Sequence, residues 1–284
     1  MKIRTALPTI VCLVLAAQAC SSPGAEPRSP RRSGSESISG YDMVLIHGLG
    51  SSAEAWQKLT PFLESGFNLT IYELPGHGHT APVPNLTIET ASRDLARFIE
   101  DNGLDRPILV GHGIGGMIAM NYAFRFTDDV RRLIIIDAAP VQLATTEQKV
   151  DVTDRLLNDY DRFVADYFLQ LSPDAEITDL IVDQALRTDR VSFTQLLMSS
   201  FDFDLREELA YQTVPILVIG SATMFPPYED PLEHLDSIGY ANAQTIGYKL
   251  MPQTGHFVML EQPIQVAGAI IAYSLEDESS TKLK

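Results

Sequence analysis

Short apolar runs alternate with helical patterns from residue 41 onward, and this alternation constrains the fold more than any other feature of the sequence. Continuous apolar runs separated by helices are typical of parallel strands with both faces covered. The pattern therefore predicts an α/β fold, a doubly wound and mostly parallel sheet of about six strands with right-handed crossovers. The expected strands are YDMVLI (41–46), FNLTIY (67–72), PILVG (107–111), RLIIID (132–137), VPILVIG (214–220) and TIGYKLM (245–251).

Residues 141–212 interrupt the alternation. The segment shows no apolar strand run, and aromatic residues such as Phe163 and Tyr167 recur in it at helix-like spacing. Because the segment lies between two expected strands, we expect it to fold back over the sheet as a helical cap. The predicted core then comprises residues 40–140 and 213–276, followed by a frayed tail at 277–284.

The first residues have the pattern of an export signal. Lys2 and Arg4 form a short basic region before an apolar run that ends in small residues and is too short for a comfortable membrane span of about 20 residues. We therefore expect residues 1–19 to be a signal peptide. The stretch AAQACSS resembles the lipobox of bacterial lipoproteins, which implies a lipid on Cys20 and attachment to a membrane through it. Plain secretion after Ala19, to a periplasmic or external location, is the alternative.

Composition adds further constraints. Residues 20–39 are rich in Ser, Pro, Gly and Arg, which predicts a flexible tether. Cys12 and Cys20 are the only cysteines, so we expect the exported domain to lack an internal disulfide. The formal net charge of −16 argues against a nucleic-acid partner, because phosphate binding needs clustered Lys and Arg.

The loops that follow the expected strands carry most of the residues with chemical potential. In an open parallel sheet, ligands bind beyond the carboxyl ends of the strands. These loops read HGLGSSAEAW, ELPGHGHT, GHGIGG, DAAP and TGHFVMLEQP. They hold five of the six histidines, namely His47, His77, His79, His112 and His256. The sequence therefore predicts a site at this edge of the sheet.

Taken in order, the segments HGLGSSAEAW, ELPGHGHT, LVGHGIGGMIA, IIIDAAP, VPILVIG and TGHFVMLEQP resemble the α/β-hydrolase superfamily with a helical cap. The resemblance covers about residues 41–273, and it lacks the antiparallel hairpin that usually precedes the first of these strands. It implies an α/β/α sandwich that works without a cofactor. His77 and His79 have a spacing that could suggest a metal site, but the family uses no metal and no third ligand is evident, so we expect none.

The resemblance also implies roles for individual residues. His256 matches the general-base histidine. The backbone N–H groups of Leu49 and Ile114 match the pair that stabilises an oxyanion. His47 and Gly48 belong to the oxyanion loop, in which the histidine is usually structural. His112 is expected to support the turn beside it.

Two positions depart from the family pattern. Gly113 stands where the nucleophilic serine is expected, and glycine has no side chain that could attack a substrate. Thr223 stands where the family usually has the aspartate that orients the histidine. Asp137, one strand earlier, is a candidate to take this role, and Glu229 and Asp230 are weaker substitutes.

Three functions remain open from the sequence. The first is a degenerate or non-classical hydrolase that binds a small apolar or amphiphilic molecule under the cap. The second is an enzyme in which His256 and Asp137 form an acid/base pair without a covalent intermediate, for lyase chemistry, proton abstraction or attack of water on an ester or lactone. The third is a serine esterase inactivated by substitution at Gly113.

Overall fold

The computed structural model describes residues 40–224 and 230–276 of the chain. The predicted signal peptide, the tether, Cys20, Glu229 and the tail at 277–284 lie outside the described residues. None of the helices in the described ranges combines the length and the apolar character that crossing a membrane requires.

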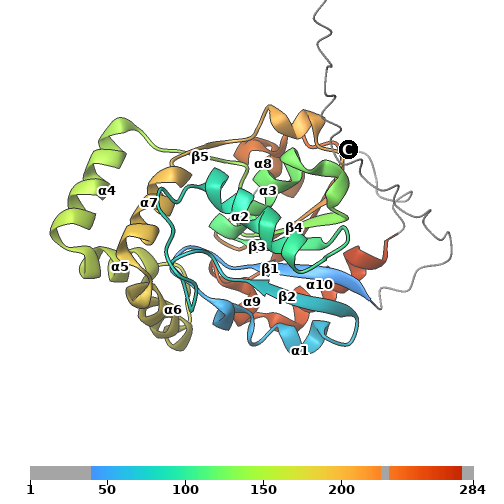
Figure 1. The fold of residues 1–284 in the computed structure, drawn as a ribbon, viewed down its shortest axis with the longest axis horizontal. Coiled ribbons are helices and arrows are strands. Elements are labelled where there is room, and N and C mark those ends of the chain that lie inside the picture. The colour runs from blue at the N-terminus through green and yellow to red at the C-terminus, as the bar shows by residue number, and fades with distance from the viewer. Residues whose placement is uncertain (1–39, 225–229, 277–284) are drawn as a thin grey trace, which may run out of the picture. The chain divides into compact units, whose positions relative to one another are not determined.

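Six strands form one parallel sheet in the order β2-β1-β3-β4-β7-β8 (Figure 1). This architecture confirms the predicted fold class, and each strand falls on one of the expected apolar runs. The strands are β1 (Tyr41–Ile46), β2 (Phe67–Tyr72), β3 (Ile108–His112), β4 (Arg132–Ile136), β7 (Ile216–Ser221) and β8 (Ile246–Met251).

Helices cover both faces of the sheet. In Figure 1, α2 (Ile88–Asp101) and α3 (Ile114–Arg125) lie on one side of it. On the other side lie α1 (Thr60–Leu63), α9 (Val258–Glu261) and α10 (Pro263–Leu275). The connections between these elements contain further short helices, namely η1 (Ala53–Trp56), η2 (Thr127–Asp129), η3 (Glu208–Tyr211), α8 (Pro231–Leu235) and the π-helical η4 (Asp236–Tyr240).

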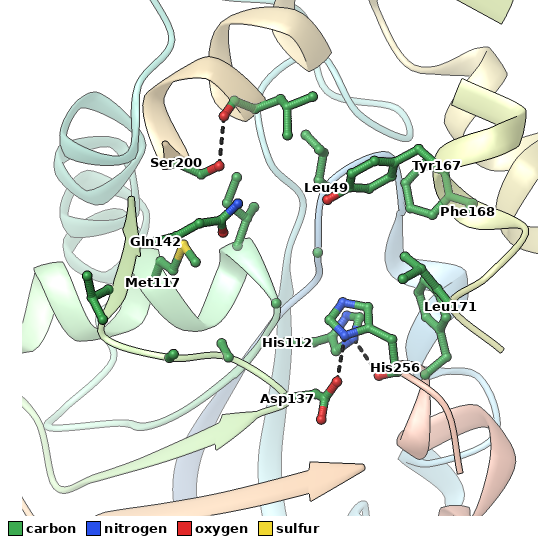
Figure 2. Close-up of a pocket in the computed structure, with 18 residues that line it drawn as sticks. Leu49, His112, Met117, Asp137, Gln142, Tyr167, Phe168, Leu171, Ser200 and His256 are labelled. Carbon is green, nitrogen blue, oxygen red and sulfur yellow. Dashed lines mark hydrogen bonds and ion pairs between the residues drawn. The ribbon is translucent and has the colours of Figure 1, made fainter. Parts of the chain in front are cut away.

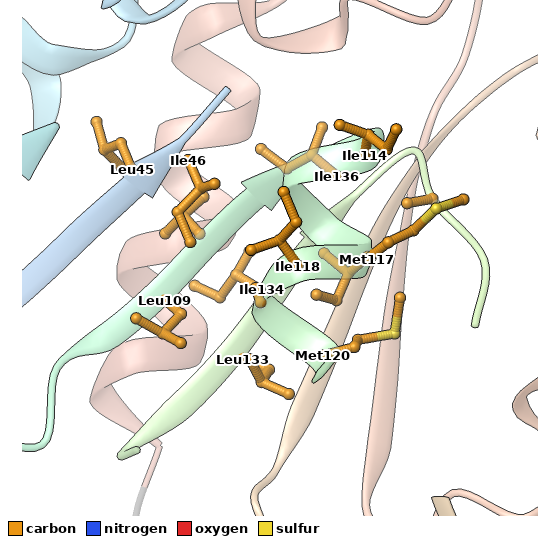
Figure 3. Close-up of a cluster of buried hydrophobic side chains, with 14 of the residues drawn as sticks. Leu45, Ile46, Leu109, Ile114, Met117, Ile118, Met120, Leu133, Ile134 and Ile136 are labelled. Carbon is orange, nitrogen blue, oxygen red and sulfur yellow. The ribbon is translucent and has the colours of Figure 1, made fainter. Parts of the chain in front are cut away.

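The central strands are buried on both faces, which explains why they read as uninterrupted apolar runs. Every residue of β3 and β4 is buried, and the cluster in Figure 3 joins Ile134 and Ile136 of β4 to Ile118 of α3. The edge strands β2 and β8 leave several residues partly exposed. The core therefore lies around β1, β3, β4 and β7, and three of these strands, β1, β3 and β4, lead into candidate site loops.

The segment between β4 and β7 is mostly helical, with α4 (Thr146–Asn158), α5 (Tyr160–Phe168), α6 (Ala175–Arg187) and α7 (Arg190–Ser200). The expectation that it contains no strand is wrong. Strands β5 (Val141–Leu143) and β6 (Asp202–Asp204) pair antiparallel at its two ends. Strands of three residues are too short to show an alternating pattern, and their partners are far apart in the sequence.

The junction of β3 and α3 is packed too tightly for a side chain at Gly115. A Cβ there would lie 2.4 Å from the carbonyl oxygens of Ile46 and His47 in the neighbouring strand and its loop. These are backbone atoms, so the clash cannot be relieved by a rotamer change. The start of α3 is thereby held directly against the end of β1.

We expect Gly115→Ala to lower the free energy of unfolding by on the order of 1–3 kcal/mol through overpacking. Gly268→Ala, in the middle of α10 with open space around it, is the matched control. It should stabilise the chain by up to about 1 kcal/mol, since alanine favours a helix over glycine. Urea denaturation measures both, and equal effects of the two substitutions would contradict the packing described here.

Candidate active site

The turn between β3 and α3 places position 113 opposite His256. Gly113 has φ 52° and ψ −122°, a left-handed conformation that glycine adopts without the penalty a Cβ brings. A Cβ at this position would lie 3.1 Å from His256 Nε2 and 4.0 Å from the Cα of Gly48. The direction of the missing side chain therefore points between the imidazole and the predicted oxyanion loop.

His256 and Asp137 are hydrogen-bonded to each other (Figure 2). His256 follows β8 and Asp137 follows β4, and the histidine Nδ1–H donates to Asp137 Oδ2 at 2.7 Å. The other carboxylate oxygen accepts from the backbone N–H of Ser221, at 2.7 Å. Because Nδ1 carries the hydrogen, Nε2 presents a lone pair toward position 113.

Asp137 has an unusual backbone conformation for this arrangement. Its φ is +48°, in the left-handed region that few side chains other than Asn and Asp visit. Its N–H still donates to Ile219 at 2.8 Å, so the residue leaves the sheet only after its last ladder bond. The backbone thus turns sharply and directs the carboxylate toward His256.

The other positions considered for the acid lie in different surroundings. Thr223, which has no carboxylate, follows β7, and its N–H donates to the hydroxyl of Ser221. The carboxylate of Asp230 is exposed and accepts from the N–H groups of Leu232 and Glu233, so it caps α8. Of the two described candidates, Asp137 and Asp230, the structure brings only Asp137 to the histidine.

Leu49 and Ile114, the residues predicted to supply the oxyanion-binding N–H groups, line the same cavity. Leu49 follows β1 and Ile114 is the first residue of α3, and both line the cavity beside Gly113. Within residues 40–224 and 230–276, neither N–H donates to a protein acceptor. The Ile114 N–H also lies at a helix N-terminus, where the dipole favours negative charge. This pair can stabilise an oxyanion.

His47 and His112 lie behind the cavity and are buried. His47 donates from Nδ1 to the carbonyl of Gly48 at 2.8 Å and accepts at Nε2 from Leu74, and desolvation lowers its pKa to about 3. His112 donates from Nε2 to the carbonyl of His256 at 3.0 Å, and burial together with the nearby His256 holds its pKa well below the ordinary value. Both are neutral side chains that fix the backbone of neighbouring loops.

His77 and His79 have separate environments. His77 is buried and donates to the carbonyl of Pro75, and desolvation lowers its pKa to about 4. The His79 side chain is 95% exposed, and its Nδ1 lies 3.7 Å from Glu73. No group of three His, Cys, Asp or Glu side chains with metal-binding geometry occurs among the described residues.

A cavity of about 190 Å³ opens above these groups, between the sheet and the cap. Figure 2 shows Met117, Gln142 and Ser200 on one side of it, with Tyr167, Phe168 and Leu171 on the other. Among the residues that the structure describes, no lysine or arginine lines it. The sequence does not predict Met117, Gln142, Leu171 or Ser200 as site residues. Met117 lies in α3, where it reads as an ordinary core position, and the other three reach the cavity only through the fold of the cap.

Comparisons with known proteins agree with the fold. The sequence model of the family described as "Alpha/beta hydrolase family" matches residues 43–269. A pimeloyl-[acyl-carrier protein] methyl ester esterase of Vibrio cholerae is 28% identical over 192 residues, covering 63% of this chain and 74% of the relative.

Solved structures share the fold. A bromoperoxidase from Bacillus anthracis superposes with a TM-score of 0.75 at 18% identity, covering 84% of this chain and 93% of the other. A thermophilic esterase from Thermogutta terrifontis gives a TM-score of 0.73 at 22% identity, covering 83% and 90%.

The buried histidines make stability depend on pH. His77 has a pKa of about 4 in the folded chain, whereas an unfolded chain restores the ordinary value of 6.5. Between these values only the unfolded chain binds the proton. Stability from this group is therefore complete above pH 6.5 and falls as the pH drops toward 4, by about 1.4 kcal/mol per pH unit.

We expect His77→Gln to reduce the loss of stability between pH 7 and pH 5 by about one proton's contribution. His79→Gln, at an exposed histidine two residues away, should leave that loss unchanged. Urea unfolding of the three proteins at both pH values measures the slopes. Equal slopes in the parent and in His77→Gln would contradict the neutral state of buried His77.

Proposed function

Because the chain belongs to the alpha/beta hydrolase family, we propose that it hydrolyses small uncharged esters or lactones with His256 activating water directly. One observation carries this proposal. The imidazole is oriented by Asp137 at 2.7 Å, and its Nε2 faces the place where a side chain at Gly113 would be. A general base needs one imidazole nitrogen held by a hydrogen bond and the other able to accept a proton, and His256 has both features.

The proposed step uses water in place of a nucleophilic side chain. As the water oxygen attacks the acyl carbon, His256 Nε2 takes its proton, and Asp137 stabilises the imidazolium. The carbonyl oxygen becomes an oxyanion that accepts hydrogen bonds from Leu49 and Ile114. When the acyl C–O bond breaks, the imidazolium returns the proton to the leaving alkoxide, giving an acid and an alcohol.

This mechanism limits the substrates. Loss of the nucleophile from a serine hydrolase costs about 10⁶ in kcat, whereas a positioned general base supplies typically 10²–10⁴. We therefore propose activated esters and strained lactones as substrates, because their uncatalysed hydrolysis has a lower activation barrier. The Vibrio cholerae relative is named as a methyl ester esterase, which supports ester chemistry for this site.

The cavity supports a small and uncharged acyl group. Its volume of about 190 Å³ is below the roughly 300–1,000 Å³ typical of sites for drug-sized ligands. With no lysine or arginine among the described residues of the wall, a carboxylate or phosphate on the ligand would lose its hydration without gaining a counter-charge. The amide of Gln142 can hydrogen-bond a neutral polar group on the substrate.

Ligand binding without turnover is the second candidate, and the glycine at position 113 favours it. In that case the protein is a degenerate hydrolase that holds an apolar or amphiphilic molecule under the cap. A serine esterase inactivated by replacement of its serine with Gly113 would have the same residues around this position. For the whole protein we also propose export through residues 1–19 and attachment to a membrane by a lipid on Cys20, supported by the sequence pattern alone.

We expect His256→Ala to lower kcat on a panel of activated esters and lactones by about 10²–10⁴, the share of a general base. Asp137→Asn should lower it in the same direction, since an amide no longer stabilises the imidazolium. Asp230→Asn is the matched control, because asparagine caps a helix as well as aspartate does. Ligand-induced rises in melting temperature that persist in His256→Ala, with no turnover in the parent, would instead support the binding function.

We expect Gly113→Ala to reduce turnover about as far as His256→Ala, since a Cβ 3.1 Å from Nε2 occupies the place proposed for the water. Gly103→Ala has a similar left-handed φ of +64° but open space around it, so it controls for backbone strain.

Gly113→Ser tests whether the surroundings of position 113 can activate a nucleophilic side chain. The serine should make the protein react with a fluorophosphonate, with which the parent does not react. Labelling of the parent would show a covalent nucleophile elsewhere and would overturn the water mechanism.

A further inference from the structure

The cap contacts the backbone of the predicted catalytic histidine directly. The N–H of His256 donates to the carbonyl of Leu171, at 2.6 Å. Leu171 belongs to the connection between α5 and α6, and its side chain lines the cavity. One of the hydrogen bonds that hold the histidine backbone therefore comes from the cap and not from the sheet.

Glu261 joins the same two segments a second time. Its Oε1 accepts from the hydroxyl of Ser172 in the cap at 2.8 Å, and its Oε2 accepts from the N–H of Gly255 at 2.7 Å. The Ser172 oxygen in turn accepts from the N–H of Asp174, which caps the start of α6. A single carboxylate thus connects the first turn of a cap helix to the residue before His256.

The α5–α6 connection and the loop before His256 are packed too closely to admit a side chain at Gly255. A Cβ at Gly255 would lie 2.3 Å from the carbonyl oxygen of Leu171 and 2.8 Å from the Cα of Ser172. Backbone therefore lies against backbone at the point where Glu261 makes its two hydrogen bonds. A shift of the cap connection by even a fraction of this spacing must move the histidine loop or break these bonds.

We propose that Glu261 is a positioning residue that couples the cap to His256. With Ser172 it holds the cap connection on Gly255, which keeps the His256 N–H on Leu171 and the imidazole between Asp137 and position 113. When the cap connection is displaced, the histidine loses this support. Closure of the cap over a substrate then also aligns the imidazole of His256, because the same hydrogen bonds hold both. The effect on catalysis rests on the proposed function, but the link between cap and histidine does not.

The test compares Glu261→Ala, Glu261→Gln and Ser172→Ala in the whole protein. Hydrogen exchange at the His256 N–H, followed by NMR, reports the Leu171 bond without any substrate. We expect exchange about tenfold faster in Glu261→Ala and faster in Ser172→Ala, since both release the cap connection. Glu261→Gln should restore most of the protection, because its amide can still accept from Gly255 and donate to the Ser172 oxygen.

Kinetics on an ester that the parent hydrolyses give the second measurement. Glu261→Ala should lower kcat about tenfold with KM within about threefold, since the carboxylate acts on the alignment of the base. The double variant with Ser172→Ala should be no slower than Glu261→Ala alone, as expected for two residues in one hydrogen-bonded unit. The controls are Ser237→Ala, whose hydroxyl bonds its own turn at His234, and Glu64→Ala at an exposed glutamate.

Unchanged exchange at His256 in both Glu261→Ala and Ser172→Ala would overturn the link itself. Faster exchange with unaltered kcat would overturn its role in positioning the base. An equal loss in Glu261→Gln would overturn the hydrogen-bonding explanation. If the parent hydrolyses no ester or lactone, the proposed function fails, and the exchange measurement alone then decides whether the cap holds the histidine.

Discussion

The hydrogen bond between His256 and Asp137 is the interaction on which the rest of the site depends. It spans β7, because Asp137 follows β4 and His256 follows β8, with β7 between them in the sheet. The second carboxylate oxygen takes the N–H of Ser221 at the end of β7. One buried side chain therefore connects the carboxyl ends of three neighbouring strands and orients the imidazole relative to the sheet.

Around this bond lie the other groups that the proposed hydrolysis uses. Leu49, Ile114 and His256 are brought to one cavity by the end of β1, the start of α3 and the loop after β8. At Gly113 the backbone retains the sharp left-handed turn, with nothing attached to it. The hydrogen bonds around this position are nevertheless made, so in the proposed function the attacking atom comes from water and not from a side chain.

The sheet and the edge that carries the site were predictable, because burial on both faces of a strand requires a continuous run of apolar residues in the sequence. Strands buried on both faces, such as β3 and β4, have to be apolar throughout, and the loops after them have to form one edge. The choice of Asp137 over Asp230 needed the structure, because only the sheet order shows which carboxylate reaches a residue 119 positions away. Gln142 and the Ser172–Glu261 contact, across 89 positions, depend on how the cap folds back, and no repeating pattern encodes that.

The short β5–β6 pairing has a consequence for how this architecture can change. Because Val141 pairs with Asp204, the whole cap leaves and re-enters the sheet domain at one narrow neck. Insertions, deletions or complete exchange of the intervening helices would leave the strands in place, since only the neck has to close. Such a cap can diversify faster than the sheet beneath it. The restraint on that divergence is the α5–α6 connection, where a replacement would have to rebuild a contact with the histidine loop.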